Sequence, residues 1–317
     1  DKMLDIVRFW AGMGVDGFRC DMVELVPADF FTWLIREIHK QYPEIVFIAE
    51  VYQKELYSKY IREVGFDLLY DKSGMYDTIR AIVQKNTDDS GVPVEAWQST
   101  RKITWNWQSL GDLQPYMLNF LENHDEQRFA SDFFGKDAGN VFAALYASLY
   151  FNRASFMIYS GQEVGERGMY QEGFSGKDGR STIFDWYTSD KVRKLWRYIH
   201  GDMKALDRKD VALLERYRSA LTQATGNRAV ISGSTYDLCY CNLSSDGFCV
   251  DRHFAFLRDC GDDTVLVACN FSNVDAEMEL SIPEHAFQWL ELNETETLNH
   301  NKPIRLKVPA MDATVVK

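Results

Sequence analysis

Short apolar runs alternate with longer amphipathic stretches from the start of the chain to about residue 227. The runs have the length and composition of buried strands, and the stretches between them repeat apolar side chains at helical spacing. Five strands are predicted, at residues 15–21, 45–51, 66–70, 117–121 and 155–159. Helices are predicted at residues 1–12, 28–42, 57–64, 76–85, 141–151, 191–206 and 211–225. Such alternation indicates a parallel sheet with right-handed crossover connections.

The polar segment 86–112 interrupts this alternation and is longer than an ordinary connection. It is expected either to contain a helix of its own or to form part of a binding surface. Beyond it, the pattern changes again after residue 228.

The last part of the chain contains short strand-like runs separated by Gly, Asn, Asp and Ser. They lie at residues 229–232, 237–242, 254–258, 264–270, 277–282 and 304–308. This spacing predicts an all-β antiparallel sandwich. We therefore expect two domains, residues 1–228 with the parallel sheet and residues 229–317 with the sandwich.

The composition predicts a large apolar core and an acidic surface. The chain has 317 residues, 46% of them hydrophobic, and a formal net charge of −12. This charge argues against nucleic acid or an anionic membrane as a partner, because no basic stripe is present, and it favours a neutral ligand. No apolar run approaches the roughly 18 to 20 residues of a membrane span. Because Asp1 opens directly on a helical pattern, we expect the chain to be a piece of a longer polypeptide.

The six cysteines are expected to be free thiols rather than a disulfide framework. Their spacing does not match a zinc site. Cys239 and Cys241 lie two positions apart in a strand-like run, which predicts that they stand side by side on one face of that strand.

Three short segments carry carboxylates at the ends of predicted strands. They are Gly-Phe-Arg-Cys-Asp at 17–21, Ile-Ala-Glu at 48–50 and Glu-Asn-His-Asp at 122–125. The carboxyl ends of parallel strands meet at one edge of a sheet, and in a β/α barrel that edge is the active-site face. The sequence therefore predicts that the three acids converge there.

Residue types at these strand ends indicate distinct roles. Arg19 and Asp21 share one side of their strand, so the guanidinium is expected to keep Asp21 ionised, as a nucleophile requires. Glu50 ends an apolar run, and poor solvation favours the protonated form that a general acid needs. Asp125 offers a third carboxylate, and His124 offers an imidazole donor. Together they supply what retaining glycoside cleavage requires.

The ordered set Gly-Phe-Arg-x-Asp, Ala-Glu and Asn-His-Asp resembles the second, third and fourth sequence signatures of the α-amylase family of retaining glycoside hydrolases and transglycosylases. Further segments that resemble the family sequence lie at residues 65–67, 159–163, 254–258 and 270–272, so that the resemblance covers nearly the whole chain. It implies that Asp21 is the nucleophile, Glu50 the acid/base and Asp125 the stabiliser of the transition state. Arg19 and His124 would contact these acids and the substrate.

The resemblance also implies the ligand and the fold. The substrate would be an α-glucan, cleaved by double displacement, with transfer to another sugar as the alternative reaction. No redox cofactor is implied, and the structural calcium that relatives often bind is held mainly by residues outside this chain. Trp97, Trp105 and Trp107 are expected either to stack on sugar rings or to pack in the core.

Two other functions remain open from the residues alone. One is a metal-dependent barrel enzyme with Asp21, Glu50, His124 and Asp125 as ligands, which is disfavoured because Arg19 would lie beside the cation. The other is a non-catalytic carbohydrate-binding relative, which is disfavoured because all three acids are present.

The chain departs from the family pattern in two ways. Glu24 and Leu25 occupy positions where many starch-cleaving members have lysine and histidine. The first family signature and the first three barrel strands are absent, and five strands cannot close an eight-stranded (β/α)8 barrel. We therefore expect the C-terminal part of a TIM barrel, for which the sequence leaves both activity and inactivity of the isolated chain open. Its open edge should self-associate or pair with the missing N-terminal half.

Overall fold

The computed structural model describes residues 1–86, 93–170, 177–181, 189–261 and 263–317. Five strands form one parallel sheet in the order β1-β2-β3-β4-β5. They are β1 (Gly17–Cys20), β2 (Val46–Ala49), β3 (Leu68–Tyr70), β4 (Met117–Phe120) and β5 (Ser155–Met157). Each lies inside one of the five predicted runs, so the predicted parallel sheet is confirmed.

Helices precede, connect and follow these strands. They are α1 (Lys2–Gly12), α2 (Ala28–His39), α3 (Tyr57–Lys59), α4 (Asp77–Asn86), α5 (Arg101–Leu110), α6 (Phe142–Tyr150), α7 (Asp190–Ile199) and α8 (Arg208–Thr225). A π-helix, Tyr60–Val64, continues α3. Helix α5 confirms that segment 86–112 contains a helix of its own, and residues 87–92 of that segment lie outside the described residues. Among the described residues, none of the helices has the length and apolarity needed to cross a membrane.

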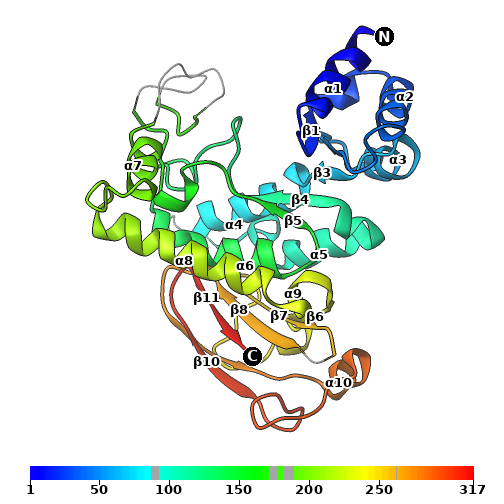
Figure 1. Ribbon diagram of the computed structural model, residues 1–317. Coiled ribbons are helices and arrows are strands. Elements are labelled where there is room, and N and C mark those ends of the chain that lie inside the picture. Colours follow the sequence, from blue (N-terminus) through cyan, green and yellow to red (C-terminus); the bar gives the residue numbers. More distant parts are fainter. Residues whose placement is uncertain (87–92, 171–176, 182–188, 262) are drawn as a thin grey trace.

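Burial explains why these segments are helical. Helix α2 places Phe31, Leu34, Ile35 and Ile38 on one buried face, because residues three and four apart share a side of a helix. Helix α6 is apolar on nearly all sides, since it contacts strands β4 and β5 of the parallel sheet as well as the C-terminal strands β8 (Thr264–Asn270) and β11 (Asp312–Val316). Helix α6 thus joins the two parts of the molecule (Figure 1).

The C-terminal part contains two antiparallel sheets. A four-stranded sheet has the order β11-β8-β7-β6, with β6 (Ser234–Asp237) and β7 (His253–Asp259), and β9 (Ala276–Leu280) pairs with β10 (Ile304–Val308). Figure 1 shows these strands, coloured yellow to red, beneath α6 and α8. The predicted strands at 254–258, 264–270, 277–282 and 304–308 are confirmed, whereas β11 and helix α10 (Glu284–Leu290) were not predicted.

Two predicted strands are wrong. Residues 229–232 belong to helix α9 (Arg228–Ser232), because the Asn227 side chain caps that helix by accepting a hydrogen bond from the Val230 amide at 3.2 Å. In run 237–242, the Asp237 carboxylate accepts from the Cys239 amide at 2.8 Å, and the chain turns into the 3₁₀ helix Tyr240–Asn242. Cys239 and Cys241 therefore do not share a strand face. All six cysteines are free thiols, as expected.

One buried arginine fastens the C-terminal sheet to the helices. Arg258 of β7 is fully buried, and its guanidinium donates to the carbonyl oxygens of Tyr150 at 2.7 Å, Val230 at 3.0 Å and Gly233 at 2.8 Å. Burial lowers the pKa of Arg258 to about 10. The three carbonyl contacts supply hydrogen bonds for both terminal nitrogens of this buried guanidinium, whereas its buried Nε has no hydrogen-bond partner.

Candidate active site

The carboxyl ends of β1 and β2 bring two acids onto one guanidinium. These strands are parallel, with Arg19 opposite Ile48, so Asp21 and Glu50 follow neighbouring strands at the same level. The Arg19 guanidinium donates from Nη1 to Asp21 Oδ1 at 2.5 Å, and its Nη2 lies 2.9 Å from Glu50 Oε1. The predicted pairing of Arg19 with Asp21 is confirmed, and the structure extends it to Glu50.

Glu50 is buried among hydrogen-bond donors rather than among apolar groups alone. Its side chain is 3% exposed, in agreement with the expected poor solvation. Besides Arg19, it accepts from the Met22 amide at 2.8 Å and from the Tyr52 hydroxyl at 2.6 Å. Met22 has a φ of 43°, a left-handed conformation that is uncommon for a residue with a side chain. This turn directs the amide after Asp21 towards Glu50.

Charges at the site change the pKa values of its bases and phenols. Burial opposes the charged form of Arg19, but the hydrogen bond to Asp21 and the charge of Glu50 outweigh it and raise the pKa of Arg19. The pKa of Tyr52 is also raised, first by burial and then by its hydrogen bond to Glu50. Both groups therefore keep their protons and remain donors.

Asp125 and His124 follow strand β4 and contact each other. His124 Nε2 is 3.1 Å from Asp125 Oδ2. The Asn123 side chain accepts from the Asp125 amide at 2.9 Å, which fixes the turn after β4. Burial raises the pKa of Tyr70. The Arg19 guanidinium opposes this rise, and the charges of Glu50 and Asp125 add to it.

The three acids differ widely in exposure. The Asp21 side chain is 73% exposed, compared with 3% for Glu50 and 34% for Asp125. Asp21 is open because β1 is the edge strand of the parallel sheet. Among the described residues, no strand therefore covers the side of Asp21 away from β2.

Sequence reasoning missed three residues at this site. Tyr52 lies two positions after Glu50, and strand parity was a signal that could have found it. Tyr70 ends β3, and its ring centroid lies 5.2 Å from the Arg19 guanidinium carbon. Glu24 accepts from the Gln53 amide at 3.0 Å and from its side-chain nitrogen at 2.8 Å. Glu24, where the sequence departs from the family pattern, therefore fixes the loop after β2.

The described residues contain no group of three or more His, Cys, Asp or Glu side chains placed to hold a metal ion. In addition, the Arg19 guanidinium contacts both Asp21 and Glu50, so it occupies the position that a cation shared by these acids would need. The metal-dependent alternative has no support in this arrangement.

The three tryptophans of segment 86–112 differ in their surroundings. Trp107 packs in the core, with its ring centroid 5.2 Å from that of Phe151. Trp97 and Trp105 are 56% and 55% exposed. Trp107 is thus partly buried against the core, whereas Trp97 and Trp105 are largely exposed, with Lys102 Nζ 3.4 Å from the Trp105 ring centroid.

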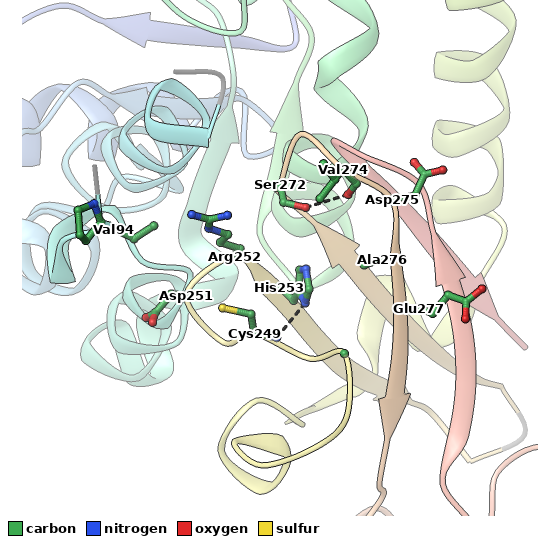
Figure 2. Close-up of a pocket in the computed structure, with 12 residues that line it drawn as sticks. Val94, Cys249, Asp251, Arg252, His253, Ser272, Val274, Asp275, Ala276 and Glu277 are labelled. Carbon is green, nitrogen blue, oxygen red and sulfur yellow. Dashed lines mark hydrogen bonds between the residues drawn. The ribbon is translucent and has the colours of Figure 1, made fainter. Parts of the chain in front are cut away.

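A cavity of about 590 Å³ lies away from these acids, beside the C-terminal sheet. Figure 2 shows the residues that line it, including Cys249, Arg252 and His253. The Cys249 amide donates to His253 Nδ1 at 2.9 Å, and burial lowers the pKa of His253 to about 4. His253 therefore acts here as a neutral acceptor that holds a turn. None of the three candidate catalytic acids lines this cavity.

A buried ion pair supports the loop that carries Asp125. Glu122 lies 2.9 Å from the Arg128 guanidinium and accepts from the Phe129 amide at 2.8 Å. Burial raises the pKa of Glu122 to about 7, against the opposing effect of Arg128. Burial also raises the pKa of Asp71, at the end of β3, to about 6.

These raised pKa values predict a stability that falls as pH rises. The folded state holds the proton more tightly than the unfolded state, so the stabilisation is complete below about pH 4 and is lost as pH passes through about 6 to 7. We expect Glu122→Gln to reduce this decline in the free energy of unfolding by about 1 to 3 kcal/mol. The raised pKa of Asp71 should cause the part of the decline that is left in this variant.

Denaturant unfolding between pH 4.5 and 8 measures this effect. Glu277→Gln, at a side chain that is 78% exposed, is the matched control and should keep the slope of the wild-type chain. An unchanged slope in Glu122→Gln would contradict the assignment.

Comparison with known proteins identifies the family to which the chain belongs. The sequence model described as the catalytic domain of alpha amylase matches residues 1–205. The chain belongs to the α-amylase family. Its five parallel strands, their helices and the antiparallel C-terminal sheets are the corresponding part of that family's barrel and β domain.

Named relatives of this α-amylase family chain include both transferases and hydrolases. It is 26% identical over 261 residues to the cyclomaltodextrin glucanotransferase of Geobacillus stearothermophilus. This alignment covers 73% of this chain and 34% of the relative. It is 36% identical over 70 residues to the alpha-1,4-glucan:maltose-1-phosphate maltosyltransferase of Corynebacterium glutamicum, covering 22% of this chain and 10% of the relative.

Among solved structures, the α-amylase from H. orenii matches with a TM-score of 0.66 and 17% identity, over 99% of this chain and 63% of that one. These matches show that the chain spans less than two thirds of the length of its named relatives.

Proposed function

We propose that this chain carries the catalytic acids of a retaining glycoside hydrolase that cleaves α-glucosidic bonds in starch-like or maltodextrin-like α-glucans. Asp21 is the nucleophile, Glu50 the general acid and base, and Asp125 the stabiliser of the oxocarbenium-like transition state. The observation that carries this proposal is the Arg19 guanidinium that bridges Asp21 and Glu50. Two carboxyls of a retaining enzyme stand roughly 5 to 5.5 Å apart, a gap that one guanidinium can bridge.

The reaction proceeds by two displacements. Asp21 attacks the anomeric carbon and forms a covalent ester, while Glu50 protonates the glycosidic oxygen of the leaving sugar. Arg19 keeps the Asp21 carboxylate ionised and oriented for attack. Glu50, now ionised, then removes a proton from water, and the resulting attack on the anomeric carbon releases the sugar and restores Asp21.

Asp125 and His124 act on the sugar rather than on the bond. The Asp125 carboxylate stabilises positive charge on the ring during both displacements. His124, 3.1 Å from Asp125, donates to a sugar hydroxyl. Arg19 and His124 are therefore proposed as substrate-binding partners of the three acids.

Transfer to a second sugar is the alternative reaction. It uses the same covalent ester, and only the acceptor in the second displacement differs. The transferase names of two relatives favour it. A non-catalytic carbohydrate-binding role has less support, because the acids and the arginine that orients them are all present.

We propose residues 1–228 as the C-terminal part of the catalytic barrel and residues 229–317 as a separate β-sandwich domain. The family match ends at residue 205, within the first of these. Helix α9, which lies at the proposed boundary, contacts both α8 and β7.

Product analysis from maltoheptaose tests the reaction. The natural polypeptide that contains these residues should release shorter maltooligosaccharides whose new reducing ends are first seen by NMR as the α-anomer. Longer products in addition would indicate transfer. Initial release of the β-anomer would contradict the double displacement, and the absence of any cleavage would contradict the proposed function.

An apolar groove of about 700 Å³ lies beside β1, the edge of the parallel sheet. Met3, Ile6, Trp10 and Phe18 line it, and Ile6 and Trp10 are each 50% exposed. We propose that this face is covered by polypeptide that continues the parallel sheet. The isolated chain is expected to cover it by self-association.

Light scattering of the isolated chain tests this surface. We expect concentration-dependent association, and a monomer with less binding of an apolar dye after the double change Ile6→Glu and Trp10→Glu. Ile199→Glu, at another apolar side chain that is 65% exposed, is the control and should still associate. A monodisperse wild-type monomer with little dye binding would exclude the proposed surface.

A further inference from the structure

A second cavity, of about 710 Å³, lies between α5, β6 and α10. It is distinct from the site of the acids, since Asp21, Glu50 and Asp125 do not line it. Two helices that are far apart in the sequence, together with the first strand of the C-terminal sheet, form its walls. Its volume is in the range of about 300 to 1,000 Å³ that is usual for small-ligand sites.

Helix α10 gives one face to this cavity. His285, Gln288 and Trp289 all line it, and they lie on one side of the helix because they are three and four positions apart. Trp289 is 71% exposed, so most of its ring is free of protein contact. An indole this exposed contributes little to the core and is available to a ligand.

Helix α5 gives the opposite face in the same way. Thr104, Trp107 and Gln108 line the cavity at the same three- and four-residue spacing. The Thr104 hydroxyl donates to the Asp237 carboxylate of β6 at 2.8 Å, which fixes α5 to the floor of the cavity. The cavity walls are thus tied together before any ligand binds.

Three polar aromatic side chains form a hydrogen-bonded group at this cavity. The Tyr236 hydroxyl lies 2.6 Å from His285 Nδ1, and the Tyr240 hydroxyl lies 2.7 Å from His285 Nε2. The two tyrosine hydroxyls also contact each other. The rings of Tyr240 and His285 are nearly parallel, at an interplanar angle of 8°, and Tyr240 is 51% exposed. Flat ring faces and fixed hydroxyls therefore adjoin one another.

The lining defines the class of ligand. It contains no Lys or Arg, and its one carboxylate, Asp237, already accepts from Thr104. An anionic ligand would lack a counter-charge there. Exposed ring faces with hydroxyl, amide and imidazole groups beside them instead suit a neutral ligand with apolar C–H faces and hydroxyl edges, which is a sugar.

We propose that this cavity is a second α-glucan binding site that holds the polymer away from the catalytic acids. The choice of an α-glucan among sugars rests on the proposed function. Trp289 stacks on one sugar ring, and the Tyr240 hydroxyl, held by His285, accepts a hydrogen bond from one of the sugar hydroxyls. Because this site does not contact the scissile bond, its loss should weaken binding of long chains and leave the cleavage of a short substrate such as maltotriose unchanged.

Titration calorimetry with maltoheptaose tests the site without turnover. It uses Glu50→Gln protein and the same protein with Trp289→Ala or Tyr240→Ala added. We expect each added change to weaken one class of maltoheptaose sites about tenfold. Tyr240→Phe keeps the ring and removes the hydroxyl, so it separates a lost contact from a fold defect. Trp196→Ala, at a tryptophan of α7 that is 59% exposed, is the matched control and should have no effect.

Each other outcome overturns the proposal. Unchanged maltoheptaose binding in folded Trp289→Ala and Tyr240→Ala proteins would exclude the cavity as a sugar site. Equal binding of cellohexaose would overturn the α-glucan assignment. A failure of the catalytic proposal would give a different result. The natural polypeptide would then not cleave maltotriose, whereas the binding of maltoheptaose to this cavity would be unchanged.

Discussion

Replacement of Glu50 by glutamine is expected to lower kcat for maltoheptaose cleavage by about 100- to 10,000-fold, the usual contribution of general acid–base catalysis. Glutamine retains the shape of the side chain. Its single carbonyl oxygen can accept from the Met22 amide, and its NH2 group can donate to the Tyr52 hydroxyl oxygen in place of accepting from it. It cannot donate a proton to the leaving oxygen. Steady-state assay of the natural polypeptide that contains these residues measures the effect.

A fluoride leaving group distinguishes a lost acid from a damaged site. Fluoride departs without protonation, so Glu50→Gln should still react with α-maltosyl fluoride in the first displacement. Glu55→Gln, at an exposed acid a few residues beyond the same strand, is the control and should retain the activity of the wild type. If the rate of fluoride release in the first displacement fell as much as maltoheptaose cleavage, Glu50 would not be the general acid.

Replacement of Asp21 by asparagine is expected to have the larger effect, a loss of at least about 10,000-fold in kcat, because the covalent step requires an ionised carboxylate. Asparagine preserves the volume of the side chain and removes the charge that Arg19 contacts at 2.5 Å. The loss should be equally large with maltoheptaose and with α-maltosyl fluoride, since both substrates need the nucleophile.

The control for Asp21 lies on the same strand segment. Asp16→Asn changes an exposed acid at the opposite, amino end of β1 and should leave kcat unchanged. Recovery of activity with the fluoride in Asp21→Asn would contradict its role as the nucleophile. The opposite responses of the Glu50 and Asp21 variants to this one substrate assign the two roles.

Strand ends were the most predictable part of this molecule. Buried parallel strands are nearly continuous apolar runs. The buried Phe47 and Ala49 belong to such a run, which predicted β2, and Glu50 is the first charged residue after it. Parity along β1 then predicted that Arg19 and Asp21 point the same way, which their 2.5 Å contact confirms. Local sequence rules sufficed because both features depend on residues next to each other.

Contacts between distant segments were not predictable in this way. The apolar run at 229–232 has the composition of a strand, but the Asn227 cap makes it helical. The bridge from Arg19 to Glu50 depends on the pairing of β1 with β2, and the amide of Met22 reaches Glu50 only through a left-handed turn. No pattern within one segment predicts these geometries, and the cavity between α5 and α10 was missed for the same reason.

Trapping of the covalent intermediate tests the central claim most directly. Glu50→Gln protein incubated with α-maltosyl fluoride should undergo the first displacement and then stall, because no base remains to activate water. Peptide mass spectrometry should then find a maltosyl group esterified to Asp21. A maltosyl group on any other residue, or no adduct while the fluoride is consumed, would contradict the account.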